Sequence, residues 1–270
     1  MKSLMLKAAK AAGKVVLKNY GRPGKIRFKN PRSIVTQTDI LSEKIIIGAI
    51  KKRFPNHNFL SEECGTINKN SKYTWIIDPI DGTTNFVSKI PEFAVSIALA
   101  KNDKIVMGAV YNPVSNKMFF AEKGKGSYLN NKKLHVSRKN KLKDCLITFS
   151  LPSSIRIAGK TLFILTKNYG IFRGLRNFGS AALNLCYIAE GKFDLYFSLS
   201  LKSWDVAAAK LIVEESEGKT TNLDGKKWNT QDRSLVATNG ILHNKFIELL
   251  NKKTLYRSLL NNNKNNEYLK

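Results

Sequence analysis

The spacing of apolar and polar residues predicts a chain of alternating helices and short strands. Residues 1–20 have apolar side chains near one face and lysines on the other, which predicts a first helix. The same spacing predicts further helices over residues 39–54, 151–170, 181–190, 203–218 and 243–259. Short apolar runs predict strands over residues 25–29, 34–35, 59–63, 75–77, 93–100, 104–112, 117–124, 145–149, 171–175, 193–197 and 234–238. We expect a polar loop over residues 64–74, a hairpin at the Gly-Lys-Gly turn after residue 123, and a frayed tail over residues 261–270.

This mixture of elements indicates an α/β (α+β) fold. A chain of 270 residues is long enough to bury a sizeable core, as one large domain or as two closely packed subdomains. We place the boundary between the two subdomains, about 1–140 and 141–260, near residue 140, within a single domain that covers residues 1–270.

The most informative stretch runs from Trp75 to Phe86 and has the sequence WIIDPIDGTTNF. An apolar strand ends at Asp78, and Asp81 follows three residues later. Carboxylate oxygens are the ligands that Mg²⁺ prefers, often together with a phosphate. Gly82 and Thr83 follow, and their N–H groups at a helix start would suit a phosphate. Taken by itself, the Asp-Pro pair favours a turn and a helix cap that bind nothing.

The full twelve-residue string resembles the signature of the inositol monophosphatase family of Mg²⁺-dependent, lithium-sensitive phosphatases. The resemblance extends over residues 25–250. It implies a layered αβαβα fold, a homodimer, and hydrolysis of a small phosphorylated metabolite. That metabolite would be inositol monophosphate, another sugar or polyol phosphate, or a nucleotide-type phosphate.

The resemblance also assigns roles to individual residues. The metal ligands that it implies for two or three Mg²⁺ ions are Glu62, Asp78, Asp81, Asp205 and the carbonyl of Ile80. It implies that Asp39 and Thr83 activate the attacking water. It implies that the groups on the phosphate and substrate side are Gly82, Thr83, Ser180, Ala181 and Ser198. Without the resemblance, Asp39 and Asp205 would be first-turn acids that favour their helices.

Ser198 is also where the sequence departs from the family. Seven residues before the matching Asp205, inositol-preferring members carry a glutamate, and this chain has a serine. A serine hydroxyl still forms hydrogen bonds, but hydrogen bonds to a charged acceptor are roughly twice as strong. The inositol preference is therefore open, while the acids implied for catalysis are present.

The net charge of +26 adds a second hypothesis. A charge of that size attracts phosphorylated substrates and RNA, so an RNA- or transcription-associated binding role on the same scaffold is the alternative. The lysines are scattered along the whole chain, which favours a simple excess of Lys and Asn. Three widely separated cysteines, lysines throughout the first 14 residues and the lack of an 18-residue apolar run predict a cytoplasmic protein outside the membrane.

Overall fold

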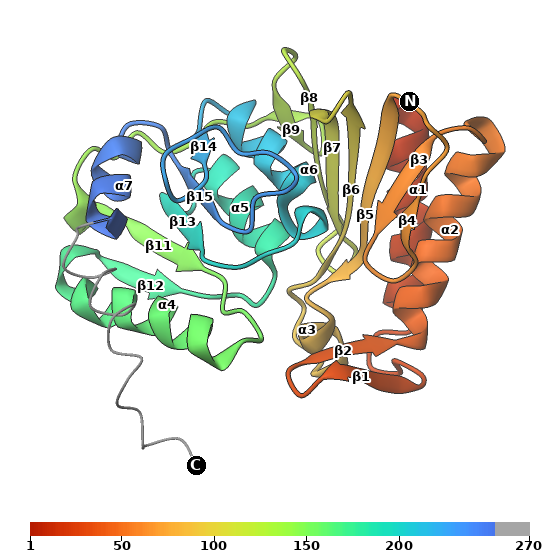
Figure 1. Ribbon diagram of the computed structural model, residues 1–270, viewed down its shortest axis with the longest axis horizontal. Coiled ribbons are helices and arrows are strands. Elements are labelled where there is room, and N and C mark those ends of the chain that lie inside the picture. Colours follow the sequence, from red (N-terminus) through yellow and green to blue (C-terminus); the bar gives the residue numbers. More distant parts are fainter. Residues whose placement is uncertain (252–270) are drawn as a thin grey trace.

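The structure is a computed structural model and describes residues 1–251. Helices and sheets alternate in five layers (Figure 1). The α-helices among these residues are α1 (Lys2–Lys18), α2 (Gln37–Arg53), α3 (Thr83–Val87), α4 (Ile155–Lys167), α5 (Ala181–Ala189), α6 (Ser203–Glu214) and α7 (His243–Asn251). Two 3₁₀ turns are η1 (Leu142–Asp144) and η2 (Tyr169–Ile171).

The larger sheet has eight strands in the order β10-β9-β8-β7-β6-β5-β3-β4. Its strands are β3 (Asn58–Ser61), β4 (Gly65–Ile67), β5 (Tyr73–Asp81), β6 (Ala94–Lys101), β7 (Lys104–Asn112), β8 (Lys117–Glu122), β9 (Ser127–Leu129) and β10 (Lys132–Lys133). Neighbouring strands pair antiparallel except β3 and β5, which are parallel. A separate hairpin of β1 (Ile26–Asn30) and β2 (Ser33–Thr36) precedes α2.

The smaller sheet has five strands in the order β12-β11-β13-β15-β14. Its strands are β11 (Leu146–Phe149), β12 (Gly174–Arg176), β13 (Leu195–Ser198), β14 (Lys219–Thr221) and β15 (Leu235–Thr238). β11 runs parallel to both of its neighbours, and β15 is antiparallel to β13 and β14.

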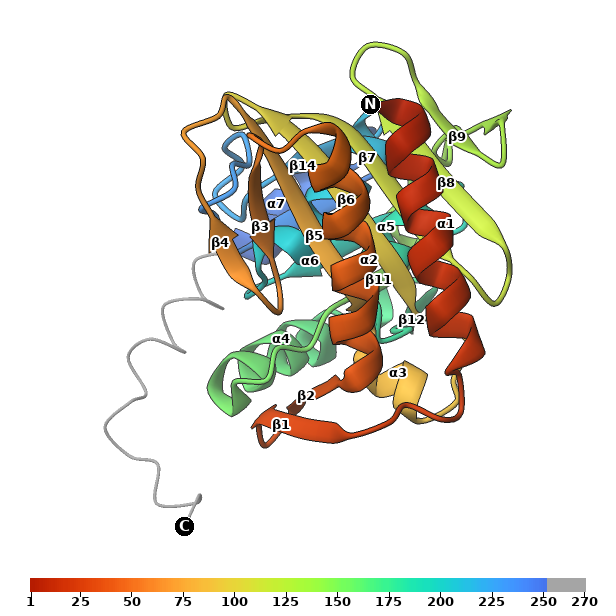
Figure 2. The same ribbon diagram turned by 90° about the vertical axis from the view of Figure 1, so that its right-hand side faces the viewer.

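The layers meet at three apolar cores. α1 and α2 lie side by side on one face of the larger sheet (Figure 2). Because successive strand residues face opposite sides, Ile77 packs toward these helices and Ile76 packs toward α5 and α6 between the sheets. The third core joins the smaller sheet to α4 and α7, with Ile147, Ile164 and Phe246 fully or almost fully buried.

The αβαβα architecture implied by the resemblance is confirmed, and most predicted elements lie within a few residues of their expected positions. Three expectations were wrong. The strand predicted to end at residue 77 continues to Asp81, the loop expected over residues 64–74 contains β4, and β14 was missed. β4 and β14 have only three residues each, which is too short to show a periodic pattern.

The Gly-Lys-Gly turn does join two antiparallel strands, β8 and β9, as expected. The two sheets separate near residue 140, but the division into subdomains stays a prediction. The tail over residues 261–270 and the predicted end of the last helix near residue 259 lie outside the described residues. Within residues 1–251, no helix is both long and apolar enough to cross a membrane.

Candidate metal and phosphate site

The end of β5 is irregular where the two predicted aspartates lie. The pairing of β5 with β6 is regular up to Asp78, then shifts before Asp81. Pro79 has no N–H to donate to a ladder, which explains why the regular pairing stops there. The Ile80 N–H instead donates to Asp78 Oδ1 at 3.0 Å. Asp78 and Asp81 are 2 % and 8 % exposed, so the strand ends by burying two acids.

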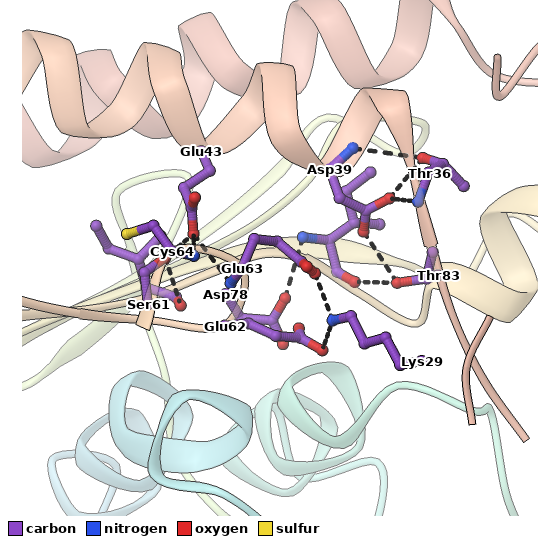
Figure 3. A network of polar contacts seen from close by, with 12 residues as sticks. Lys29, Thr36, Asp39, Glu43, Ser61, Glu62, Glu63, Cys64, Asp78 and Thr83 are labelled. Atoms are coloured by element: carbon purple, nitrogen blue, oxygen red, sulfur yellow. Dashed lines mark hydrogen bonds and ion pairs between the residues drawn. The ribbon is translucent and has the colours of Figure 1, made fainter. Parts of the chain in front are cut away.

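Parallel pairing brings Glu62 to the same level of the sheet. Ser61 pairs with Ile77 in the β3–β5 ladder, and the Glu62 N–H donates to the Ile77 carbonyl at 3.2 Å. Glu62 therefore follows β3 at the point where Asp78 follows Ile77 on β5. The ammonium of Lys29, from the β1–β2 hairpin, lies between the two acids at this end of β3, 2.8 Å from Glu62 and 2.6 Å from Glu63 (Figure 3).

Glu43 contacts the same turn from the α2 side, a contact that the sequence analysis did not identify. It lies on α2 and is 5 % exposed. Its Oε1 accepts hydrogen bonds from the Ser61 hydroxyl, from the Glu63 N–H at 3.1 Å and from the Cys64 N–H at 3.2 Å (Figure 3). Its position four residues after Asp39, on the same helix face, was the only signal in the sequence.

Asp39 and Thr83 are in contact, as the resemblance implied. Asp39 lies in the first turn of α2 and forms a capping box with Thr36, whose N–H donates to Asp39 Oδ2 at 2.8 Å. The Thr83 hydroxyl lies 3.1 Å from Asp39 Oδ1 and 3.0 Å from the Ile80 carbonyl oxygen. Asp39 therefore caps a helix and also accepts from a hydroxyl at the end of β5.

Asp81 joins the larger sheet to the first turn of α5. Its carboxylate accepts from the Ser180 hydroxyl and from the N–H groups of Ala181 at 3.3 Å and Ala182 at 2.9 Å. Gly82, with a φ of 90°, lets the two segments approach, because a Cβ there would lie 3.3 Å from the Gly179 carbonyl oxygen. The structure thus places Ser180 and Ala181 directly beside Asp81.

Asp205 comes from the first turn of α6, far away in the sequence. Its Oδ2 accepts from the Lys202 N–H at 2.7 Å. Asp205, Asp81 and Glu62 line one cavity of about 500 Å³. The helix start brings the fourth predicted carboxylate to the end of the larger sheet, next to the other three.

Burial and neighbouring negative charges raise the pKa of three carboxyl groups in and beside this cavity. Burial, followed by the charges of Glu62, Asp81, Asp205 and Asp39, holds the pKa of Asp78 well above its usual value. Burial raises the pKa of Asp81 to about 6 in spite of its hydrogen bonds to Ser180 and α5. Burial raises the pKa of Asp205 to about 8, with the charges of Asp81 and Glu62 adding to the effect. Bound cations would stabilise the ionised form of these carboxylates, which otherwise repel one another.

Ser198 does not line this cavity. Its side chain is fully buried at the end of β13, and its hydroxyl donates to the Ser200 carbonyl oxygen at 3.1 Å. A serine is too short to extend from this strand position into the cavity. The cavity wall on this side is formed by Ser200, Leu201 and Lys202, and a substrate contact by Ser198 stays a prediction.

The donor set fits a hard divalent cation. Its members are oxygen donors, they are wholly or partly buried, and their mutual repulsion is relieved by a cation. Within residues 1–251, no three of these side chains lie close enough together to bind one metal ion. In this conformation Lys29 is paired with Glu62. Carboxylates that need cations, beside a hydroxyl and a glycine turn, form the kind of site found in a metal-dependent phosphatase.

Comparisons with known proteins agree with this class. Residues 1–255 match the inositol monophosphatase family. An inositol-1-monophosphatase from Caulobacter vibrioides is 37 % identical over 91 % of this chain and 99 % of its own length. A protein from Pasteurella multocida named Nus factor SuhB is 37 % identical over 88 % of this chain and 90 % of its own. The crystal structure of the extragenic suppressor protein SuhB from Bartonella henselae is similar with a TM-score of 0.88 and 37 % identity, covering 93 % of this chain and 98 % of that one.

The chain belongs to the inositol monophosphatase family. It is therefore a metal-dependent phosphomonoester hydrolase.

Proposed function

We propose that this chain is a Mg²⁺-dependent phosphatase of small phosphorylated metabolites, with inositol monophosphate or a related sugar or polyol phosphate as substrate. The observation that carries the proposal is the group of Asp78, Asp81 and Asp205, whose pKa values are raised by burial and by the charges of neighbouring carboxylates. Such a group lowers the stability of the fold at neutral pH unless cations bind to it.

Glu62, Asp78, Asp81, Asp205 and the Ile80 carbonyl would hold the Mg²⁺ ions. When bound, Mg²⁺ would offset the charge of the phosphate, make water a stronger nucleophile and stabilise the leaving oxygen. Lithium sensitivity and a homodimer belong to the same proposal, on the strength of family membership.

Asp39 and Thr83 would orient the attacking water. A Thr83 hydroxyl that donates to Asp39 Oδ1 leaves its oxygen lone pairs free to accept from a water. Asp39 is 0 % exposed and is fixed by Thr36, so the acceptor that faces the Thr83 hydroxyl is held in place before substrate arrives. Water attacks the phosphorus directly in this scheme, and no covalent phospho-enzyme forms.

The turn after β5 would hold the phosphate. Gly82 and Thr83 begin α3, and their N–H groups would donate to phosphate oxygens. Ser180 and Ala181, next to Asp81, would border the rest of the substrate. The size of the cavity, about 500 Å³, leaves room for a sugar-sized group. Cys64, Cys145 and Cys186 are free thiols, which supports a cytoplasmic location.

The first test is phosphate release from a panel of small phosphomonoesters, with and without Mg²⁺. The panel contains inositol 1-phosphate, sugar phosphates and a nucleoside monophosphate, which covers the alternative of a nucleotide-type substrate. We expect Mg²⁺-dependent turnover that Asp78→Asn abolishes and that Asp224→Asn, at an exposed aspartate outside the cavity, leaves unchanged. A folded protein that turns over no member of the panel would contradict the proposal.

A second candidate function is association with RNA or the transcription machinery. It is favoured by the net charge of +26 and by the name of the Pasteurella relative. Binding through lysines to phosphates weakens steeply with salt. If this function holds, the Asp78→Asn protein, inactive as an enzyme, will still retain RNA at low salt and release it at high salt. Failure to retain RNA at low salt would remove this candidate and leave the phosphatase.

A further inference from the structure

A second cavity lies at the end of α6 that is farther from Asp205. Its volume is about 410 Å³, and its walls come from the β6–β7 turn, the last turns of α6 and the segment around Trp228. α6 packs against β6 and β7, with Asp205 in its first turn, and its last residue, Glu214, lines this cavity (Figure 1). The cavity shares no lining residue with the one that holds the carboxylates, so it is a separate place in the molecule.

Trp228 is buried in the wall of this cavity without an acceptor for its indole N–H. The residue is 4 % exposed, and its Nε1 has no hydrogen-bond partner among residues 1–251. A buried tryptophan N–H usually has a partner, because an unpaired donor has lost its bonds to water. The Asn229 N–H beside it donates to Asp232 Oδ2 at 2.8 Å, which fixes the chain after the indole. The indole is therefore held in place with a donor that a ligand could use.

The buried side chains around the indole are apolar. Ile105 and Leu211 line the cavity together with Trp228, and both are almost fully buried. Ligand sites for small molecules combine such apolar walls with a few polar groups, and they have volumes of this order. This part of the cavity suits a planar apolar group.

Two acids that line the cavity already have partners in the fold. Glu214 Oε1 lies 2.6 Å from the Lys210 ammonium, and that ammonium lies 5.7 Å from the centroid of the Trp228 ring. The two oxygens of Glu215 accept from backbone N–H groups of the β8–β9 turn, each at 2.9 Å. Neither acid is available to a cationic ligand.

The mouth of the cavity carries more positive than negative charge. Lys104, Lys123 and Lys227 line it, are exposed, and form no ion pair with a side chain of residues 1–251. Asp103 is the one acid among the exposed residues that line it. Three lysines against one aspartate attract an anion.

We propose that this cavity binds a small organic carboxylate with a planar apolar body. The body would lie against Ile105, Leu211 and the ring of Trp228, and one carboxylate oxygen would accept from the indole N–H. The other oxygen would face the lysines of the mouth. Because Nε1 is shielded from water in this conformation, we expect side chains at the mouth to shift as the ligand enters. The inference does not depend on the proposed phosphatase function.

The test uses 2-naphthoate as the probe and compares it with the neutral 2-naphthamide, which has the same shape. The chain has three tryptophans, so its ¹H–¹⁵N spectrum has three indole N–H signals, and Trp228→Phe identifies that of Trp228. Trp75→Phe and Trp204→Phe identify the same signal by elimination. We expect 2-naphthoate to move it saturably with a Kd of about 1 mM or tighter, as ordinary ligand efficiency gives. The amide should bind about tenfold more weakly, because it lacks the charge.

Substitutions at the exposed mouth should change the affinity in opposite directions. Lys227→Gln should raise the Kd of 2-naphthoate about threefold, and Asp103→Asn should lower it about threefold, as single exposed charges do. Lys10→Gln is the matched control, because it removes an equal charge from α1, outside the cavity, and should leave the Kd unchanged. The Kd should be the same with and without Mg²⁺ and in Asp78→Asn, since the ligand does not reach the metal-site carboxylates.

Three results would overturn the proposal. The first is a Trp228 signal that 2-naphthoate at about 10 mM moves no more than the signals of Trp75 and Trp204. The second is equal affinity for the amide, because recognition of an anion would then play no part. The third is an equal loss of affinity in Lys10→Gln and Lys227→Gln, which would assign binding to the general positive field. None of these results bears on phosphate release, so the phosphatase function would stand or fall separately.

Discussion

Two buried aspartates, Asp194 and Asp78, differ in whether the fold supplies a positive charge to neutralise them. Asp194 is fully buried before β13, and both of its oxygens have donors. Oδ1 accepts from the Ser137 hydroxyl, and Oδ2 accepts from the Leu146 N–H at 2.7 Å and from the Lys139 ammonium at 2.9 Å. Its negative charge is neutralised within the fold.

Asp78 is almost equally buried, but the charged groups that act on it are acids. It accepts from the Ile80 N–H, and its nearest charges are those of Glu62, Asp81 and Asp205. A buried charge with a cation and complete hydrogen bonds serves the structure, since breaking it exposes unpaired groups. Lys29 pairs with Glu62, but within residues 1–251 no cation pairs with Asp78, Asp81 or Asp205, so the charge that would neutralise these three acids must come from a ligand.

The largest effect is expected from Asp205→Asn. Removing one of the four carboxylates should lower Mg²⁺-dependent turnover by about a hundredfold or more, as loss of a metal-site residue does. The metal-free protein should unfold at the same temperature as the native one or a higher one, because a repelled carboxylate whose pKa is about 8 is removed. Phosphate release and thermal unfolding in EDTA measure the two effects. A clear loss of metal-free stability would show that Asp205 is structural, like Asp194.

Asp194→Asn should have the opposite consequence. It leaves Lys139 without its partner and weakens the hydrogen bonds of Ser137 and Leu146, which should cost about 2–3 kcal/mol of unfolding free energy. The turnover number of the folded protein should stay unchanged. Urea unfolding followed by circular dichroism measures the first quantity and steady-state kinetics the second. Unchanged stability together with reduced turnover would contradict the structural role assigned to Asp194.

Glu43 resembles Asp194 in being buried and hydrogen-bonded, but the turn that it contacts carries Glu62, which belongs to the candidate metal site. We expect Glu43→Ala to weaken Mg²⁺ binding about tenfold, through loss of the bonds to Ser61, Glu63 and Cys64. Glu43→Gln keeps one acceptor oxygen and should have a smaller effect. Titration calorimetry with Mg²⁺ alone measures the affinity without relying on turnover. The matched control is Glu248→Gln, an exposed residue of α7. Equal Mg²⁺ affinity in all three variants would restrict Glu43 to a structural role.

The smallest effect concerns pH. Asp81 and Asp205 have folded pKa values of about 6 and about 8, above the ordinary aspartate value of 3.8. The folded metal-free state therefore binds more protons than the unfolded state between about pH 4 and pH 8, and its stability falls as pH rises through this window. Bound Mg²⁺ should restore it. We expect the increase in melting temperature on adding Mg²⁺ to grow by a few degrees from pH 5 to pH 8.

Scanning calorimetry with and without Mg²⁺ measures this difference. The growth with pH should be reduced in Asp205→Asn, whereas Asp224→Asn should behave like the native protein. An increment that is independent of pH would mean that the carboxylates are not the groups that bind the metal.

The sequence by itself determined the elements with strong local signals. Long periodic helices such as α1 and α6, and apolar strands such as β7, depend on side chains close together in the chain, and they lie where the pattern predicts. The string from Trp75 to Phe86 identified Asp78 and Asp81 for the same reason, since strand, proline and glycine are neighbours. Asp39, Glu62 and Asp205 could be given roles only through resemblance to a family, because each is locally an ordinary helix or strand-end acid.

The tertiary structure decided which of these groups meet and what surrounds them. Parallel pairing of β3 with β5 sets Glu62 beside Asp78, and the start of α6 brings Asp205 to the same cavity from far away in the sequence. Burial of Ser198 and exposure of Lys202, only four residues later, likewise follow from where β13 ends and α6 begins. Distances between sequence-remote groups depend on strand register and layer packing. No short stretch of sequence encodes either of these.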